Sequence, residues 1–341
     1  MYDVVTIGDI YQDVFLLPQK AAILDSPKFF SGKGLCFGYG EKVPLDSISY
    51  FIGGSAANSA MNFSKIGLKS AIVSSVGGDD GGEKILEYFL KNQVDTSSIK
   101  QKKSDASNMS IIILYNGERT IFTYHGDRLV EDFMPKKSLK TRWFYLAPVG
   151  CDSSKLENKI IETIAKNGSG LVWNPGNFQI KKGARNFRHI LRLTNIIFIN
   201  KDELTEFVDQ PGKSETHDMM KQLALYGVKI VVVTNGKKGA ICYDGSLFYQ
   251  IGASEDKRVD ATGAGDAFAS SFSANIILSS NGKPQGYQPD RETIEKSLKW
   301  GIIVSGSVVS QLGAHEGILS RSEIEENGKK LFKLNSRVYT R

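Results

Sequence analysis

The chain has 341 residues, enough for one large α/β domain with an elaboration or for two domains, since a domain commonly holds ~100–200 residues. Hydrophobic residues make up 41% of it, but no stretch approaches the ~18 consecutive apolar residues of a membrane span, so we expect no membrane partner. The formal net charge of +6 is spread along the chain without a dense basic block, and the three cysteines form no Cys-x-x-Cys pair. These features argue against a nucleic-acid partner, a disulfide framework and a zinc site.

The first residues, MYDVVTIGDI, are typical of a strand and not of a secretory signal, so we expect a cytoplasmic protein. Short apolar runs rich in β-branched or aromatic residues predict strands at 3–9, 70–77, 142–149, 170–176, 196–201 and 229–236. Helical patterns fall between several of them and beyond, at 55–67, 81–92, 154–168 and 267–278. This alternation predicts an α/β fold with a mostly parallel sheet and helices on both faces.

Two segments interrupt the alternation. Residues 10–52 are aromatic and rich in glycine, and residues 106–130 contain two short strand patterns joined by Asn116 and Gly117, which is a strong hairpin signal. Neither segment fits a βα unit. They could be plain surface excursions, or they could form a small antiparallel sheet that lies over a site as a lid.

The segment 259–272, VDATGAGDAFASSF, places two carboxylates around a run of small residues just before a predicted buried helix. The backbone N–H groups of Gly263, Ala264 and Gly265 have almost no side chain in front of them, and a glycine-rich turn into a helix N-terminus favours anions. Asp266 could cap this helix, because aspartate is a preferred cap residue. It could instead take a proton from an attacking hydroxyl beside a bound phosphate, a combination that suits phosphoryl transfer.

The same segment carries a family resemblance. DATGAGDAF at 260–268 resembles the carboxyl-terminal signature D-T-x-G-A-G-D-x-F of the ribokinase-like (PfkB-type) carbohydrate kinases. Four further blocks lie upstream, in the order that the family has them. They are GDIYQD at 8–13, GGSAAN at 53–58 with its continuation VGGDDGG at 76–82, NKDE at 200–203 and TNGKKG at 234–239. Because these blocks come in the family's order and the resemblance runs from residue 3 to about residue 320, the chain is identified as a member of this family.

The resemblance implies a fold and a reaction. The expected fold is a ribokinase-like three-layer sandwich, one kinase domain over residues 1–341, with lid segments at about 10–52 and 106–130 inserted in it. The expected reaction moves the γ-phosphoryl group of ATP to an alcohol. Asp266 is the implied catalytic base, and the N–H groups of Gly263, Ala264 and Gly265 are implied to hold the developing charge.

The resemblance also assigns binding roles. Asn200, Thr234, Gly236, Gly239 and Gly265 are expected at ATP, and Asn200 with Glu203 near Mg²⁺, largely through water. Asp13, Gly53, Gly54, Asn58 and Asp266 are expected at the acceptor. Several relatives also hold a monovalent cation such as K⁺, and the matching positions here are Asp260, Thr262, Val308, Gln311 and Gly313. Gly317 stands where several relatives offer a serine hydroxyl, which puts potassium activation in doubt.

Some departures from the family bear on the acceptor. Ser55 replaces the lysine of ribokinase, Tyr11 replaces an asparagine, and 174–177 lacks the charged members of a common D-x-N-x-R segment, which argues against ribose. The expected acceptor is a sugar or a sugar-like molecule, and the alternative is a nucleoside such as adenosine. A binding-only relative without catalysis is a further alternative, which an intact Asp266 argues against. As in many relatives, a homodimer formed through the lid is expected.

Overall fold

The structure is a computed structural model of the whole chain. It describes residues 1–29, 31–126, 129–135, 139–149, 152–208, 215–282, 284, 286–330 and 336–340. Among them, no helix has both the length and the apolar character needed to cross a membrane.

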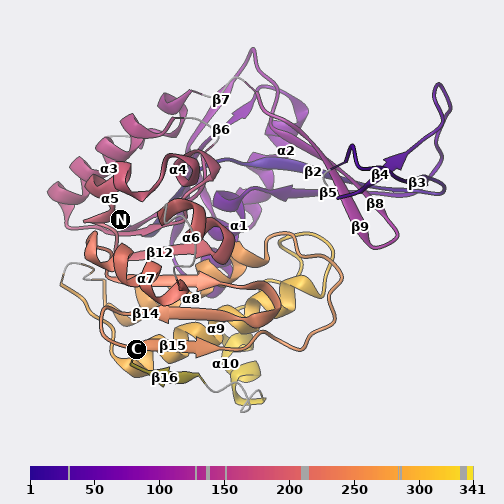
Figure 1. Cartoon of the computed structure of the whole chain (residues 1–341). Coiled ribbons are helices and arrows are strands. Elements are labelled where there is room, and N and C mark those ends of the chain that lie inside the picture. Colours follow the sequence, from indigo (N-terminus) through magenta and orange to yellow (C-terminus); the bar gives the residue numbers. More distant parts are fainter. Residues whose placement is uncertain are drawn as a thin grey trace.

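A ten-stranded sheet runs through the centre of the described chain (Figure 1). Its strand order is β16-β15-β14-β13-β12-β11-β10-β1-β6-β7. All pairs from β13 to β7 are parallel, and β14, β15 and β16 add an antiparallel edge. The strands are β1 (Tyr2–Ile7), β6 (Ser70–Gly77), β7 (Asp95–Lys102), β10 (Thr141–Leu146), β11 (Gly170–Trp173), β12 (Ile196–Asn200), β13 (Ile230–Thr234), β14 (Ala240–Tyr243), β15 (Phe248–Ile251) and β16 (Arg337–Tyr339).

Helices cover both faces of this sheet. Buried side chains on one face come from α1 (Ser55–Ile66), α2 (Asp80–Lys91), α8 (Ala264–Ser279), α9 (Arg291–Val309) and α10 (Arg321–Lys330). Those on the other come from α3 (Ser154–Asn167), α4 (Asn177–Lys182), α5 (Arg188–Leu191), α6 (Lys201–Val208) and α7 (Thr216–Leu225). Short 3₁₀ turns lie at Val130–Phe133, Ala184–Phe187 and Gly236–Lys238. The prediction of a three-layer sandwich with a mostly parallel sheet is confirmed.

Helix α8 is buried on nearly all sides. Every residue from Ala267 to Ile277 is buried, because the helix packs against α1 and α9 as well as the sheet. A helix that is buried all round is typical of a position inside the core. The amino end of α8 is therefore held rigidly by its neighbours, which matters because it carries the predicted catalytic residues.

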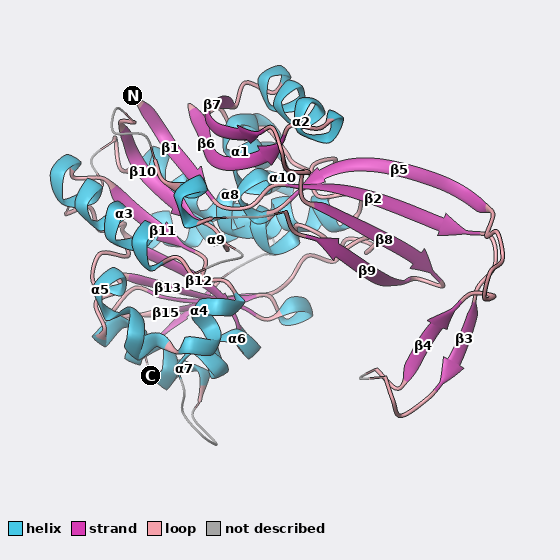
Figure 2. Ribbon diagram, turned by 90° about the horizontal axis from the view of Figure 1, so that it is seen from above, coloured by secondary structure: helices cyan, strands magenta, loops and turns pink. Residues whose placement is uncertain are grey.

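A second, separate sheet projects from the body, and Figure 2 shows it extending away from the layers. Its order is β5-β2-β8-β9, from β2 (Tyr11–Pro18), β5 (Leu45–Gly53), β8 (Met109–Tyr115) and β9 (Glu118–Tyr124). At its far end lies a two-stranded hairpin of β3 (Ala22–Asp25) and β4 (Lys33–Cys36). The turn between β8 and β9 uses Asn116 and Gly117, whose φ angles are 51° and 79°, as the sequence predicts for a tight hairpin.

This second sheet is built from the two segments that interrupt the βα alternation. Residue 30 of the first segment and residues 127 and 128 of the second lie outside the described residues. The antiparallel pairing of β5, β2 and of β8, β9 agrees with the expected small sheet, although β2 and β8 pair in parallel.

Candidate active site

The predicted phosphate-binding turn lies at the amino end of α8. Gly263 precedes the helix with a φ of 73°, and a Cβ added there would lie 2.5 Å from the Cβ of Ala314. Only glycine combines that backbone conformation with so close an approach. Gly263 thus turns the chain so that Ala264 and Gly265 begin the helix, where N–H groups lack intrahelical partners and favour an anion.

Asp266 lies in the first turn of α8 and is partly buried. Its Oδ2 accepts a hydrogen bond from Nδ2 of Asn58, 2.8 Å away on α1, and α8 has no side-chain cap. The alternative that Asp266 merely caps the helix is therefore wrong. Burial raises the pKa of this carboxyl group above its usual range, while the hydrogen bond from Asn58 acts in the opposite direction. A carboxylate with a raised pKa is a stronger base toward a hydroxyl proton.

A chain of buried hydrogen bonds fixes the amide of Asn58. Its Oδ1 lies 2.9 Å from Nε2 of His315, and Nδ1 of His315 lies 3.0 Å from the hydroxyl of Tyr88. Because an amide oxygen only accepts, Nε2 must carry the proton, and Nδ1 of the neutral ring then accepts from Tyr88. Burial lowers the pKa of His315 to about 4, which keeps the ring neutral. All donors in the chain therefore point toward Asp266.

Asp13 lies on β2 at the base of the second sheet and is buried. A Cβ at Gly53, its diagonal neighbour on β5, would collide with the Asp13 carboxylate, so glycine leaves room for that group. Burial raises the pKa of Asp13 to about 6, with a smaller contribution from the charge of Asp260 and an opposing one from Ser110. The next residue, Gly54, has a φ of 99° and packs against the backbone of residue 9 before α1 begins. The predicted acceptor residues Asp13, Gly53, Gly54 and Asn58 thus lie on β2, β5 and α1, which meet beside α8.

A cavity of about 380 Å³ gathers the predicted nucleotide residues. Thr234, Gly236 and Gly239 line it from the end of β13 and the following turn, and Ala264 and Gly265 line it from α8. The rest of the lining includes apolar and charged side chains. The apolar ones are Phe268, Ile302 and Val309, and the charged ones are Lys237, Glu255, Asp256 and Arg258. The cavity therefore connects an apolar space, suited to a flat ring, with the amino end of α8.

Asn200 and Glu203 form a reciprocal pair at the start of α6. The backbone N–H of Asn200 donates to Oε2 of Glu203, and the N–H of Glu203 donates to Oδ1 of Asn200, both at 2.9 Å. Asn200 ends β12 beside Thr234 of β13, so the pair lies at the same sheet edge as the nucleotide cavity. Burial raises the pKa of Glu203, and the backbone of Asn200 opposes that shift.

The residues predicted for a monovalent cation come together only around Asp260. Oδ1 of Asp260 accepts from the N–H of Thr262 at 3.0 Å and from its hydroxyl at 2.7 Å, and Oδ2 accepts from the N–H of Gly313 at 3.3 Å. The carbonyl of Val308 accepts from the N–H of Gln311 at 3.1 Å. These oxygens already serve as acceptors within the chain.

Comparison with known proteins settles the family. The sequence matches the profile of the pfkB family carbohydrate kinases over residues 22–321, which is most of the chain. The chain belongs to this family. It is therefore a kinase, a phosphotransferase, and the alternative of a binding-only protein is not supported.

Several pfkB relatives cover nearly the whole chain. The ATP-dependent 6-phosphofructokinase of Thermoanaerobacterium thermosaccharolyticum is 26% identical over 92% of this chain and 89% of that enzyme. The cytidine kinase of Thermococcus kodakarensis is 25% identical over 89% of this chain and 100% of that enzyme. The structure of Arabidopsis thaliana ribokinase with ribose and ATP matches with a TM-score of 0.74 and 18% identity, covering 96% of this chain and 99% of that one.

The pfkB motifs do not point to three of the residues found here. His315 and Tyr88 reach Asp266 only through Asn58: 257 positions separate His315 from Asn58, and 227 separate Tyr88 from His315. Arg119, on β9, reaches Asp260 across 141 positions. The sequence offers one hint for His315: it lies two residues after Gly313, in a segment that contacts the pfkB signature at Asp260 and Gly263. No local spacing points to Tyr88 or Arg119.

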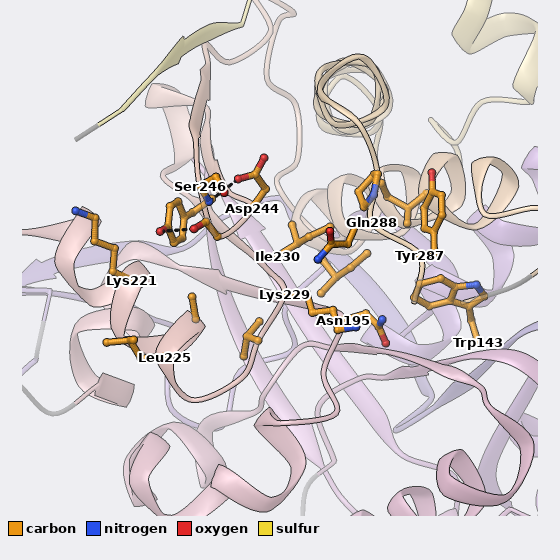
Figure 3. A pocket seen from close by; sticks show the side chains of 17 residues that line it. Trp143, Asn195, Lys221, Leu225, Lys229, Ile230, Asp244, Ser246, Tyr287 and Gln288 are labelled. Carbon is orange, nitrogen blue, oxygen red and sulfur yellow. Dashed lines mark hydrogen bonds between the residues drawn. The ribbon is translucent and has the colours of Figure 1, made fainter. Parts of the chain in front are cut away.

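A separate cavity of about 600 Å³ lies at the opposite edge of the pfkB sheet (Figure 3). Asn195 and Lys229 line it where β12 and β13 begin, and Trp143, Asp244 and Tyr287 contribute from other elements. None of the predicted catalytic or binding residues lines it. The predicted nucleotide-binding residues lie instead at the carboxyl ends of the strands, where α8 begins.

Proposed function

We propose that this pfkB kinase transfers the γ-phosphoryl group of MgATP to a hydroxyl of a sugar or sugar-like acceptor. The observation that carries the proposal is the position of Asp266. Its carboxylate lies in the first turn of α8, oriented by Asn58, beside the Gly263 turn and next to the nucleotide cavity.

In the proposed reaction, Asp266 accepts the proton of the acceptor hydroxyl as that oxygen attacks the γ-phosphorus. The bond to the β-γ bridging oxygen breaks, and ADP leaves with that oxygen. The N–H groups of Gly263, Ala264 and Gly265 hold the charge that spreads over the phosphoryl oxygens. Because the transition state is loose, fixing Asp266 and the phosphoryl group in line matters as much as basicity.

The cavity of about 380 Å³ suits ATP. The side chains of Phe268, Ile302 and Val309 offer an apolar slot for the base, and Thr234 and Gly236 flank it at the end of β13. The basic side chains of Lys237 and Arg258, which also line the cavity, favour the phosphates. The phosphates are then directed toward the amino end of α8.

Asn200 and Glu203 fit a magnesium ion held mainly by phosphates and water. Mg²⁺ commonly takes one or two protein carboxylates and keeps several waters, so no dense acidic cluster is needed, and the described residues contain none. A partly buried carboxylate with a raised pKa gains from a nearby cation. Bound Mg²⁺ would neutralise charge at the phosphates, and Asn200 and Glu203 would hold it through water.

The acceptor is proposed to bind Asp13 and Asn58, with Gly53 and Gly54 allowing close approach. A buried carboxylate can accept hydrogen bonds from two adjacent sugar hydroxyls. A cavity of about 190 Å³ lies nearby: none of these four residues lines it, but Gln12, the neighbour of Asp13 on β2, does, as do His315 and Tyr88, whose hydrogen bonds hold Asn58. It is smaller than the ~300–1,000 Å³ of pockets for drug-sized ligands, which favours a single sugar ring.

A nucleoside is the second candidate acceptor. Tyr50, Phe51 and Tyr88 line the same cavity, and aromatic faces of this kind can stack on a base. The full-length similarity to a cytidine kinase supports this candidate. The phosphorylated group would then be a ribose hydroxyl, and the role of Asp266 would not change.

The second sheet is proposed to act as a lid and to form a homodimer in the cytoplasm. It carries exposed apolar side chains on several strands, namely Leu17, Ile48, Tyr50, Ile121, Phe122 and Tyr124. Exposed apolar patches of this kind are typical of protein interfaces. Gel filtration at micromolar concentration should therefore show a dimer, and a monomer would contradict this part of the proposal.

The test is ADP release from MgATP across a panel of sugars, sugar acids, nucleosides and sugar phosphates. Asp266→Asn is assayed in parallel, and Asp290→Asn serves as a matched control because Asp290 also lies at a helix start, as the cap of α9. We expect turnover with one acceptor class that Asp266→Asn abolishes and Asp290→Asn preserves. No turnover with any acceptor, or full activity in Asp266→Asn, would contradict the proposal.

A further inference from the structure

One ion pair joins the second sheet to the start of the catalytic signature. Nη1 of Arg119, just after the β8-β9 turn, lies 3.0 Å from Oδ1 of Asp260 and 2.8 Å from the hydroxyl of Thr262. The side chain of Asp260 is only 4% exposed, whereas that of Arg119 is 39% exposed. A buried carboxylate needs a positive partner, and the hairpin supplies it.

Asp260 belongs to the set that the resemblance assigns to a monovalent cation, and the geometry does not suit such an ion. Its Oδ1 accepts hydrogen bonds from Thr262 and Arg119, and its Oδ2 accepts one from the N–H of Gly313. At Gly317, where relatives offer a serine hydroxyl, a Cβ would lie 2.5 Å from the carbonyl oxygen of Ser307. The serine hydroxyl that relatives offer is therefore missing, and the backbone around Gly317 leaves no room for a side chain there.

We infer that the Arg119 guanidinium takes the electrostatic place of the monovalent cation in this kinase. It neutralises Asp260, three residues before Gly263, and so steadies the turn that presents N–H groups to the phosphoryl group. Because arginine remains charged at all working pH values, this compensation needs no ion from solution. The inference rests on the proposed function of the 263–265 turn.

The ion pair between Arg119 and Asp260 depends on the position of the β8-β9 hairpin. The guanidinium reaches Asp260 only while the β8-β9 hairpin lies against the body, since Arg119 belongs to the second sheet and Asp260 to the loop before α8. Movement of the hairpin away from the body would remove the positive charge from Asp260. Closure of the sheet over the site would thus complete the charge balance next to the phosphate turn.

The first test measures turnover with the best acceptor in potassium chloride and in choline chloride at equal ionic strength. The wild type should have the same kcat in both salts. Arg119→Ala should lose about tenfold in kcat, less than the ~10²–10³ lost with an oxyanion-hole donor, because the guanidinium is partly exposed and acts through Asp260. Arg291→Ala, which removes an exposed arginine paired with Glu295, is the control and should be unchanged.

The second test is chemical rescue. Millimolar methylguanidinium should restore a several-fold part of the activity that Arg119→Ala loses, and should not affect the wild type or Arg291→Ala. A wild type stimulated several-fold by potassium, an Arg119→Ala enzyme as active as the wild type, or a loss that methylguanidinium leaves unchanged would each overturn the inference.

A third readout does not depend on activity. The melting temperature of the wild type should be the same in potassium chloride and in choline chloride at equal ionic strength. A higher melting temperature in potassium chloride alone would overturn the inference. If the wild type shows no turnover at all, the proposed function fails first, and this melting comparison still decides whether the chain binds a monovalent cation. Circular dichroism of Arg119→Ala confirms that the variant is folded.

Discussion

Replacement of His315 should alter the hydrogen bonding of Asp266 indirectly, because His315 contacts Asn58 and Asn58 donates to Asp266. In His315→Phe, Oδ1 of Asn58 loses its donor and the hydroxyl of Tyr88 loses its acceptor. The amide of Asn58 is then no longer held in the orientation that points Nδ2 at Asp266. In His315→Gln, the side-chain amide offers one N–H donor and one oxygen acceptor, so the same pattern can persist.

The expected size of the effect follows from burial. Asn58 is 6% exposed, and a buried acceptor left without a partner costs ~1–3 kcal/mol. If about 2 kcal/mol of that cost falls on the transition state, kcat drops about 30-fold. The hydrogen bond from Asn58 also lowers the pKa of Asp266, so its loss should move the acidic limb of the kcat profile to higher pH.

The assay is the pH dependence of kcat and KM for the wild type, His315→Phe and His315→Gln. His315→Phe should show the lower kcat and the shifted acidic limb, whereas His315→Gln should stay within a few-fold of the wild type. Equal profiles for His315→Phe and the wild type would refute the positioning role. Equal losses in both variants, with unshifted limbs, would point to packing alone.

Three further predictions concern pH and the glycine turn. Because the pKa of Asp13 is raised to about 6, the KM for the acceptor should rise as pH falls from 7 to 5, and Asp13→Asn should give a high KM that does not vary over that range. The pKa of His315 is about 4 in the folded state and ~6.5 unfolded, so the unfolded chain binds more protons between these values. Its contribution to the free energy of unfolding, about 3 kcal/mol, is present above pH 6.5 and lost as pH falls toward 4; denaturant titrations should show a flatter pH dependence for His315→Gln. Gly263→Ala should destabilise the chain by at least ~1–2 kcal/mol, because its φ of 73° is left-handed and its Cβ would overlap Ala314; an unchanged melting temperature would contradict this.

The sequence predicts the central strands well because each is a short apolar run that the parallel sheet buries on both faces. The sequence does not predict β14 and β15, at Ala240–Tyr243 and Phe248–Ile251, or the outermost strands β7 and β16. β14 and β15 are only four residues long; β14 pairs with β13 and β15 pairs with β14, so their pairing depends on these neighbours and not on a pattern of their own. The hairpin at Asn116 was predicted because its turn residues are themselves the signal.

The residues of the candidate site also fall into two groups, those that can be predicted from the sequence and those that cannot. Asp266 and Gly263 could be identified from the sequence because the turn, the helix start and the carboxylate are contiguous. The chain from Tyr88 through His315 to Asn58 could not, because it joins three elements that only the fold brings together. The ion pair between Arg119 and Asp260 could not be predicted for the same reason, because it joins the second sheet to the loop before α8.

The central claim is that Asp266 is the base for phosphoryl transfer. Its most direct test is a single-turnover measurement with excess enzyme and labelled ATP on the best acceptor, together with the Kd for ATP by calorimetry. Asp266→Asn should bind ATP as the wild type does and should transfer the phosphoryl group ~10²–10⁴-fold more slowly, the usual contribution of a general base. Transfer within tenfold of the wild type would contradict the claim.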